Sequence, residues 1–147
     1  MAQTMLTEIR ELRHDLQSTA VSIQRVQIVM YRLQAQAAPL DRAVQRLEQA
    51  RNECKQAKAQ QQMAAAAMEQ AEARKRNPQN ASDQTSAEQL ISELQASIEM
   101  WASQTQQCQS EQAEAETQFR AEQAKMNELE DQLDQLDQVL AGHDRKR

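Results

Sequence analysis

The residues of this chain best suited to chemistry are two cysteines and two histidines, and their spacing argues against a metal site. Neither Cys54 nor Cys108 belongs to a C-x-x-C pair, and His14 and His143 lie near opposite ends of the chain. Because a structural zinc ion needs four ligands at short, defined spacings, these residues form no recognisable metal motif. We expect no metal and no cofactor.

Acidic side chains are the next candidates, and many of them lie between Glu111 and Asp137. A catalytic carboxylate needs a cleft that shifts its pKa, and nothing in the pattern of these residues builds one. The single glycine excludes a glycine-rich phosphate loop, and no nucleophile motif is present. We interpret the acidic residues as a solvated face and predict that the protein is not an enzyme and has no small-molecule substrate.

The composition indicates which elements carry these residues. Of the 147 residues, 39% are hydrophobic and 27% are charged, with one Gly, two Pro and one each of Trp, Tyr and Phe. A compact domain with a sheet would need more aromatic, Gly and Pro residues, so the chain is predicted to be all-α. Apolar residues spread among Gln, Glu and Arg are typical of helices that bury a narrow stripe.

The charge and hydropathy patterns exclude two classes of partner. The net charge of −5 gives no bulk attraction to nucleic acid or to an anionic membrane surface, so a membrane partner is not expected. No apolar run approaches the length of a membrane span, and the N-terminal region lacks the apolar centre of a signal peptide. We expect a cytoplasmic protein that binds no nucleic acid.

One polar segment, from Asn77 to Ser86, divides the chain. Pro78 cannot continue a helix, Thr85 and Glu88 match a capping box that begins the next helix, and Gly142 is suited to a helix C-cap. The prediction is a single helical-hairpin domain over residues 1–147. It comprises helix one over about 3–76, a turn over 77–85, helix two over about 86–141 and a basic tail over 142–147.

Both helices carry coiled-coil heptads. The spacing in helix one starts at Met5, passes through Ile23, Met30 and Val44, and makes a three-residue slip, a stammer, between Leu47 and Ala50. The spacing in helix two is unbroken. Its seam positions are Ala87, Ile91, Leu94, Ile98, Trp101, Thr105, Cys108, Gln112, Ala115, Phe119, Glu122, Met126, Leu129, Leu133, Leu136 and Leu140.

These heptads predict a long antiparallel helical hairpin, a coiled coil whose first helix is the longer one. Pro39 leaves two alternatives open: a kinked continuous first helix, which we favour, or a break that gives three helices. A turn centred near residue 81 pairs positions whose numbers add to about 162. Cys54 and Cys108 then share a layer as two free buried thiols, with a disulfide as the alternative, and Trp101 is buried against Ala57, Gln61 and Ala64.

The two arms of the predicted hairpin are oppositely charged. Residues 1–77 carry 12 Lys and Arg against 8 Asp and Glu, and residues 78–147 carry 5 against 14. The arms therefore have net charges of +4 and −9, which favours pairing within one chain over pairing of helix two with itself.

The N-terminal part of helix one is the predicted interaction surface. Residues 2–19 extend past the end of helix two, and residues 20–33 carry apolar groups outside the seam, so the chain is predicted to form a homodimer or to bind a protein partner there. The predicted interface residues are Met5, Leu6, Ile9, Leu12, Leu16, Val21, Ile28 and Val29.

Two other functions remain open from the sequence. The size and the long hairpin resemble the small stalk proteins of flagellar and type III secretion ATPases, a resemblance of shape with no shared motif, which implies an accessory or chaperone-like part of a larger machine. The other function is reversible binding of the amphipathic N-terminal helix to a membrane surface, where basic residues would meet the lipid head groups. These basic residues are Arg10, Arg13, Arg25 and Arg32.

Overall fold

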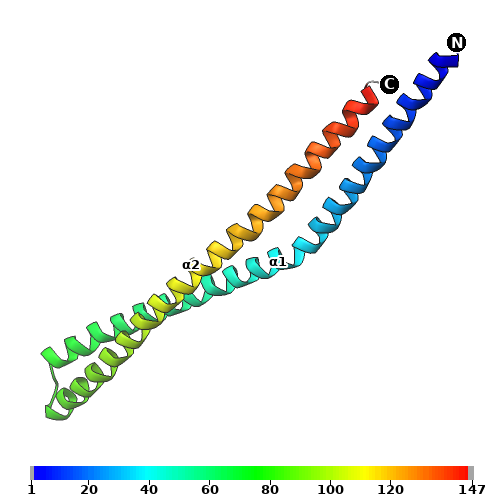
Figure 1. Ribbon diagram of the computed structural model, residues 1–147. Helices are drawn as coiled ribbons and strands as arrows, with labels where there is room; N and C mark the ends of the chain where they lie inside the picture. Colours follow the sequence, from blue (N-terminus) through cyan, green and yellow to red (C-terminus); the bar gives the residue numbers. More distant parts are fainter. Residues whose placement is uncertain (1, 146–147) are drawn as a thin grey trace. The chain divides into compact units, whose positions relative to one another are not determined.

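The computed structural model describes the backbone of residues 2–145 and the side chains of residues 2–142. It contains helix α1 (Ala2–Arg76) and helix α2 (Ala81–Arg145), which a short turn connects (Figure 1). The helices pack against each other as a hairpin, so the predicted all-α fold is confirmed. The side chains of His143 and of the rest of the predicted basic tail, residues 144–147, lie outside the described residues.

Helix α1 continues through Pro39, so the three-helix alternative is wrong. A proline inside a helix removes one backbone hydrogen bond, and tertiary packing can offset that loss. Pro39 and the following Leu40 are both half-buried. A kink at Pro39 stays a prediction.

The turn is shorter than predicted because Asn80, and not Thr85, caps the second helix. Helix α2 starts at Ala81, before the predicted start near Ser86. Asn80 Oδ1 accepts a hydrogen bond from the backbone N–H of Asp83 at 2.7 Å, which is the geometry of an N-cap. Asn is a stronger N-cap residue than Thr and occurs earlier in the chain, so the helix begins there.

Two predicted helix signals are therefore wrong. The Thr85 hydroxyl donates to the Ala81 carbonyl at 3.1 Å within the helix and does not form a capping box with Glu88. Gly142 also lies inside α2, which continues to Arg145, and its backbone does not take the left-handed conformation of a C-cap.

The Asp83 carboxylate links the two sides of the turn. Its Oδ1 accepts from Arg74 Nη2 at 3.0 Å, and its Oδ2 accepts from the backbone N–H of Gln79 at 3.3 Å. The hydrogen bond from Arg74, followed by that from Gln79, holds the pKa of Asp83 below its ordinary value. The ionised form of Asp83 is thus favoured by the fold.

Because the pKa of Asp83 is lower in the folded state, the ionised carboxylate should stabilise the fold at pH values above the unfolded-state pKa. This stabilisation should be lost as the pH falls through the folded-state pKa. Asp83→Asn should flatten the acid side of the curve of unfolding free energy against pH, measured by urea titrations from about pH 5 to about pH 2. Asp137→Asn, at an exposed position of α2, is the control. Equal slopes for both variants would contradict the prediction.

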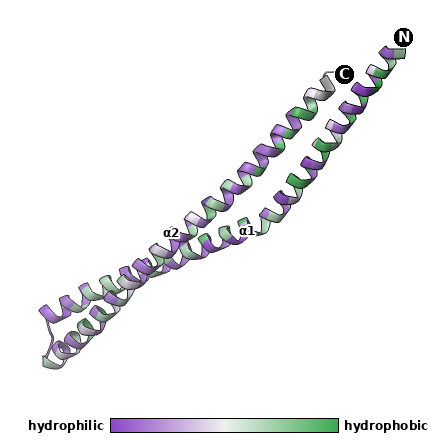
Figure 2. Cartoon of the chain, in the orientation of Figure 1, coloured by the Kyte–Doolittle hydropathy of each residue, from purple (hydrophilic) through white to green (hydrophobic). Residues whose placement is uncertain are grey.

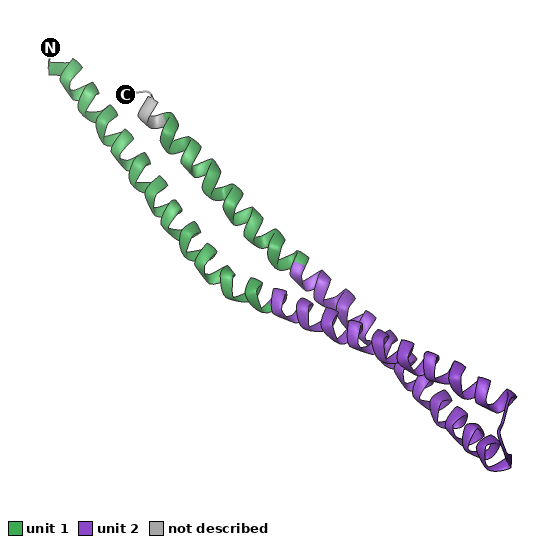
Figure 3. Cartoon of the chain, turned by 180° about the vertical axis from the view of Figure 1, so that it is seen from behind, with its two compact units in different colours: residues 1–42, 120–147 green, residues 43–119 purple. Residues whose placement is uncertain are grey.

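Contacts divide the chain into two compact units (Figure 3). Unit 1 comprises Met1–Arg42 and Arg120–Arg147, and unit 2 comprises Ala43–Phe119. Each unit contains one segment of α1 and one segment of α2. The organisation as a single domain stays a prediction.

The core of unit 2 is built largely from alanine. Leu47, Ala50 and Ala115 form a buried cluster against which Phe119 packs. Ala43 is buried, whereas we placed Val44 in the seam. The spacing between successive buried residues from Ala43 to Cys54 therefore alternates between four and three, without the predicted stammer. The buried residues of unit 2 are Ala43, Leu47, Ala50, Cys54, Ala57, Ala64, Ala71, Ala87, Cys108 and Ala115.

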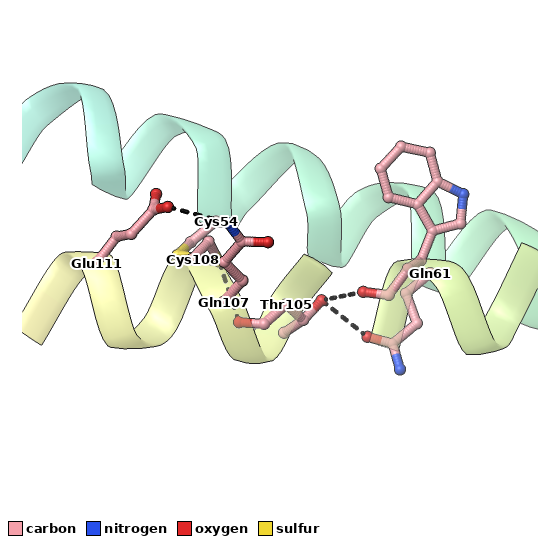
Figure 4. The surroundings of a disulfide bond; sticks show 7 residues. Cys54, Gln61, Thr105, Gln107, Cys108 and Glu111 are labelled. Carbon is pink, nitrogen blue, oxygen red and sulfur yellow. Dashed lines mark hydrogen bonds between the residues drawn. A yellow bond between two sulfur atoms is a disulfide. The ribbon is translucent and has the colours of Figure 1, made fainter. Parts of the chain in front are cut away.

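A disulfide joins Cys54 of α1 to Cys108 of α2, with 5.4 Å between the two Cα atoms (Figure 4). The predicted pairing of these two positions is confirmed, and the expectation of free thiols is wrong. Both cysteines occupy seam positions of their helices, so their side chains meet between the two backbones. One helical turn away, the Thr105 hydroxyl donates to Gln61 Oε1 at 3.4 Å.

Trp101 is half-buried, and its packing against Ala57, Gln61 and Ala64 stays a prediction. Its side chain lines an open groove that also contains Ala57 and Gln60. Small side chains on the facing helix allow the two backbones to approach each other.

The charged arms contact each other as their composition predicts. In unit 2, Arg51 Nη2 lies 3.7 Å from Glu116 Oε1, and Arg46 Nη1 donates to Gln118 Oε1 at 2.9 Å. Three of these four residues are exposed and Glu116 is half-buried, so each contact adds under about 1 kcal/mol to the free energy of unfolding.

Candidate interaction surface

The face of α1 that packs on α2 in unit 1 is partly polar. Its centre is Val29, of which 6% is exposed. Gln36 Nε2 donates to the Glu122 carboxylate and, at 3.4 Å, to the Glu122 backbone carbonyl. The half-buried positions around Val29 that continue this heptad are Ser22, Val26, Leu33, Gln36 and Leu40.

Glu122 is kept ionised within this face. The hydrogen bond from Gln36 lowers the pKa of Glu122, and the positive charges of Lys125 and Arg42 lower it further. Lys125 Nζ lies 3.4 Å from Glu122 Oε1. A seam that contains a carboxylate and an amide buries less apolar surface than a fully apolar one.

Seven of the eight predicted interface residues are exposed. Their exposed fractions range from 47% for Val21 to 65% for Met5. Val29 is the exception, because it packs against α2, and its assignment to the interface is wrong. The seven are Met5, Leu6, Ile9, Leu12, Leu16, Val21 and Ile28.

Three exposed apolar residues in the segment from Met5 to Tyr31 were missed. Ile23 and Met30 were placed in the hairpin seam, yet 48% and 49% of them are exposed, as is 73% of Tyr31. The heptad that starts at Met5 shares Thr19, Val26 and Leu33 with the heptad that packs on α2. Its alternate positions, Ile23 and Met30, each lie one residue after a position of the packed heptad. The stammer that we needed to join the two was the signal of this phase difference.

The exposed heptad forms a continuous feature of α1, which we call the N-terminal stripe. Figure 2 shows apolar residues recurring among polar ones along this part of the helix. The polar side of the same segment contains Thr7, Arg10, Glu11 and His14, which lie together. The N-terminal stripe comprises Met5, Ile9, Leu12, Leu16, Ile23 and Met30.

The described residues offer little other chemistry. Among them, no group of three or more His, Cys, Asp or Glu side chains could hold a metal ion. No helix within the described part of the chain is long and apolar enough to cross a bilayer. Comparisons with protein-family models, curated proteins and solved structures gave no match.

Proposed function

We propose that this chain is a non-enzymatic interaction protein, a helical hairpin that self-associates through its N-terminal stripe. One observation carries the proposal: the six large apolar side chains of the stripe, from Met5 to Met30, are 48% to 65% exposed. Burial of a large apolar side chain contributes about 1.5 to 3 kcal/mol. An exposed apolar surface of this size is typical of a protein interface.

The position of α2 supports the same proposal. Residues 2–14 of α1 are all exposed, and Asp15 is the first half-buried residue. Beyond Asp15, α2 contacts the face that contains Ser22 and Val29, while Ile23 and Met30 stay open. A second chain can therefore reach the stripe without displacing α2.

Sedimentation equilibrium of the intact chain tests the proposal. We expect a concentration-dependent equilibrium between a monomer and a dimer, because two copies can bury the stripe against each other. A monomer at every concentration would contradict it. Co-sedimentation with anionic vesicles separates self-association from the alternative of membrane binding, in which the chain would pellet with the lipid.

A further inference from the structure

The N-terminal stripe has the residue pattern of a parallel two-stranded coiled coil. With Met5 at position d of the heptad, Ile9, Leu16, Ile23 and Met30 fall at position a, and Leu12 falls at the next d. Among parallel coiled coils, Ile at position a with Leu at position d favours two strands. The later d positions, Thr19, Val26 and Leu33, are half-buried against α2. The neighbouring a positions, Ile23 and Met30, stay exposed and are open to a second copy.

The charges beside the stripe favour the same orientation. Glu8 occupies position g, and Arg13 occupies position e of the following heptad. In a parallel pair, g faces e of the next heptad on the other chain, so Glu8 of each copy meets Arg13 of the other. In an antiparallel pair, g faces g and e faces e, so Glu8 would not meet Arg13 of the other copy.

Neither Glu8 nor Arg13 has an oppositely charged neighbour within α1. Neighbours on a helix lie three or four residues apart, and the charged neighbours of Glu8 and Arg13 at that spacing are Glu11 and Arg10, which have like charge. Both side chains belong to exposed residues. A partner chain supplies the opposite charge that the helix itself lacks.

From the heptad and the charges together we infer that the occupant of the N-terminal stripe is a second copy of this chain, parallel and in register. The inference rests on the proposed self-association and adds its orientation. The pair begins near the N-termini, where α2 covers nothing, and extends to Met30. Each a residue of one copy faces the same residue of the other.

Disulfide trapping of two single variants, Ile9→Cys and Ile23→Cys, tests the orientation. The two positions are about 21 Å apart along the helix. The native cysteines are joined to each other, so the introduced thiol is the only free one in the described chain. We expect both variants to form covalent dimers in most molecules on oxidation, and Thr7→Cys, on the polar side, to form few.

An antiparallel pair would bring a residue to its own copy only at the centre of the overlap, so at most one of the two variants would cross-link. That result, with a dimer by sedimentation, overturns the orientation and leaves self-association intact. A monomer by sedimentation, with no cross-link in either variant, overturns both.

Charge reversal gives a second test without a new thiol. We expect Glu8→Lys and Arg13→Glu each to raise the dimer dissociation constant about tenfold, and the double variant to restore it. Glu8→Lys also places an opposite charge three residues before Glu11, so the helix of the monomer should gain stability while the dimer weakens. A double variant as weak as either single variant would overturn the parallel pair.

Discussion

A chain that carries both Ile9→Glu and Leu16→Glu is expected to be monomeric at concentrations where the intact chain is dimeric. The two substitutions remove two large apolar contacts from each copy and put four carboxylates at the centre of the interface, where desolvation of unpaired charge is costly. The dissociation constant should rise at least about a thousandfold. Sedimentation equilibrium measures the change.

The matched control is Thr7→Glu with His14→Glu. These two residues have the same seven-residue spacing as Ile9 and Leu16 but lie on the polar side of α1. The control adds the same carboxylates and should keep the dimer. Oligomers that persist in the stripe variant, or that dissociate equally in the control, would show that the stripe is not the interface.

Removal of the Cys54–Cys108 disulfide is expected to lower the free energy of unfolding by about 4 kcal/mol. The bond spans 54 positions of the chain, and a loop of that size restricts the unfolded chain by about this amount. Replacing both cysteines by alanine keeps the seam small and apolar, so the variant isolates the cross-link. Urea denaturation followed by circular dichroism measures the difference.

The intact protein in a reducing buffer provides the comparison. Its thiols are of the size of the seam residues around them, so it should lose about as much stability as the double alanine variant. A loss only in the alanine variant would mean that sulfur packing, and not the cross-link, stabilises unit 2. Because a reducing compartment would open this bond, the cytoplasmic location stays a prediction.

The fold could be predicted because helix two carries one consistent heptad. All of its predicted seam positions, from Ala87 to Leu140, are buried or half-buried. The pairing near a sum of 162 was also predictable, since the turn has few places to form. The start of α2 could not be predicted, because Asn80 and Thr85 are both residue types that cap helices. Which of the two caps α2 depends on hydrogen bonds across the turn.

The exposed apolar segment of α1 was predicted in place but not in phase. Helix one carries two overlapping heptads, and sequence spacing alone does not say which one packs on α2. We assigned Ile23 and Met30 to the hairpin because they continue the heptad that starts at Met5, and we placed Val29 outside the seam. The structure packs the less apolar face inside, around the contact between Gln36 and Glu122, and this choice depends on the rotation of the whole helix.

The alanine-rich core of unit 2 has a thermal consequence. Heat capacity rises on unfolding in proportion to the apolar surface that becomes wet, and exposed polar surface lowers it. Methyl groups such as those of Ala64, Ala71 and Ala87 release little apolar surface when the helices separate. The heat capacity change per residue should therefore fall below that of globular domains, and the free energy of unfolding should vary only gently across a broad range of temperature.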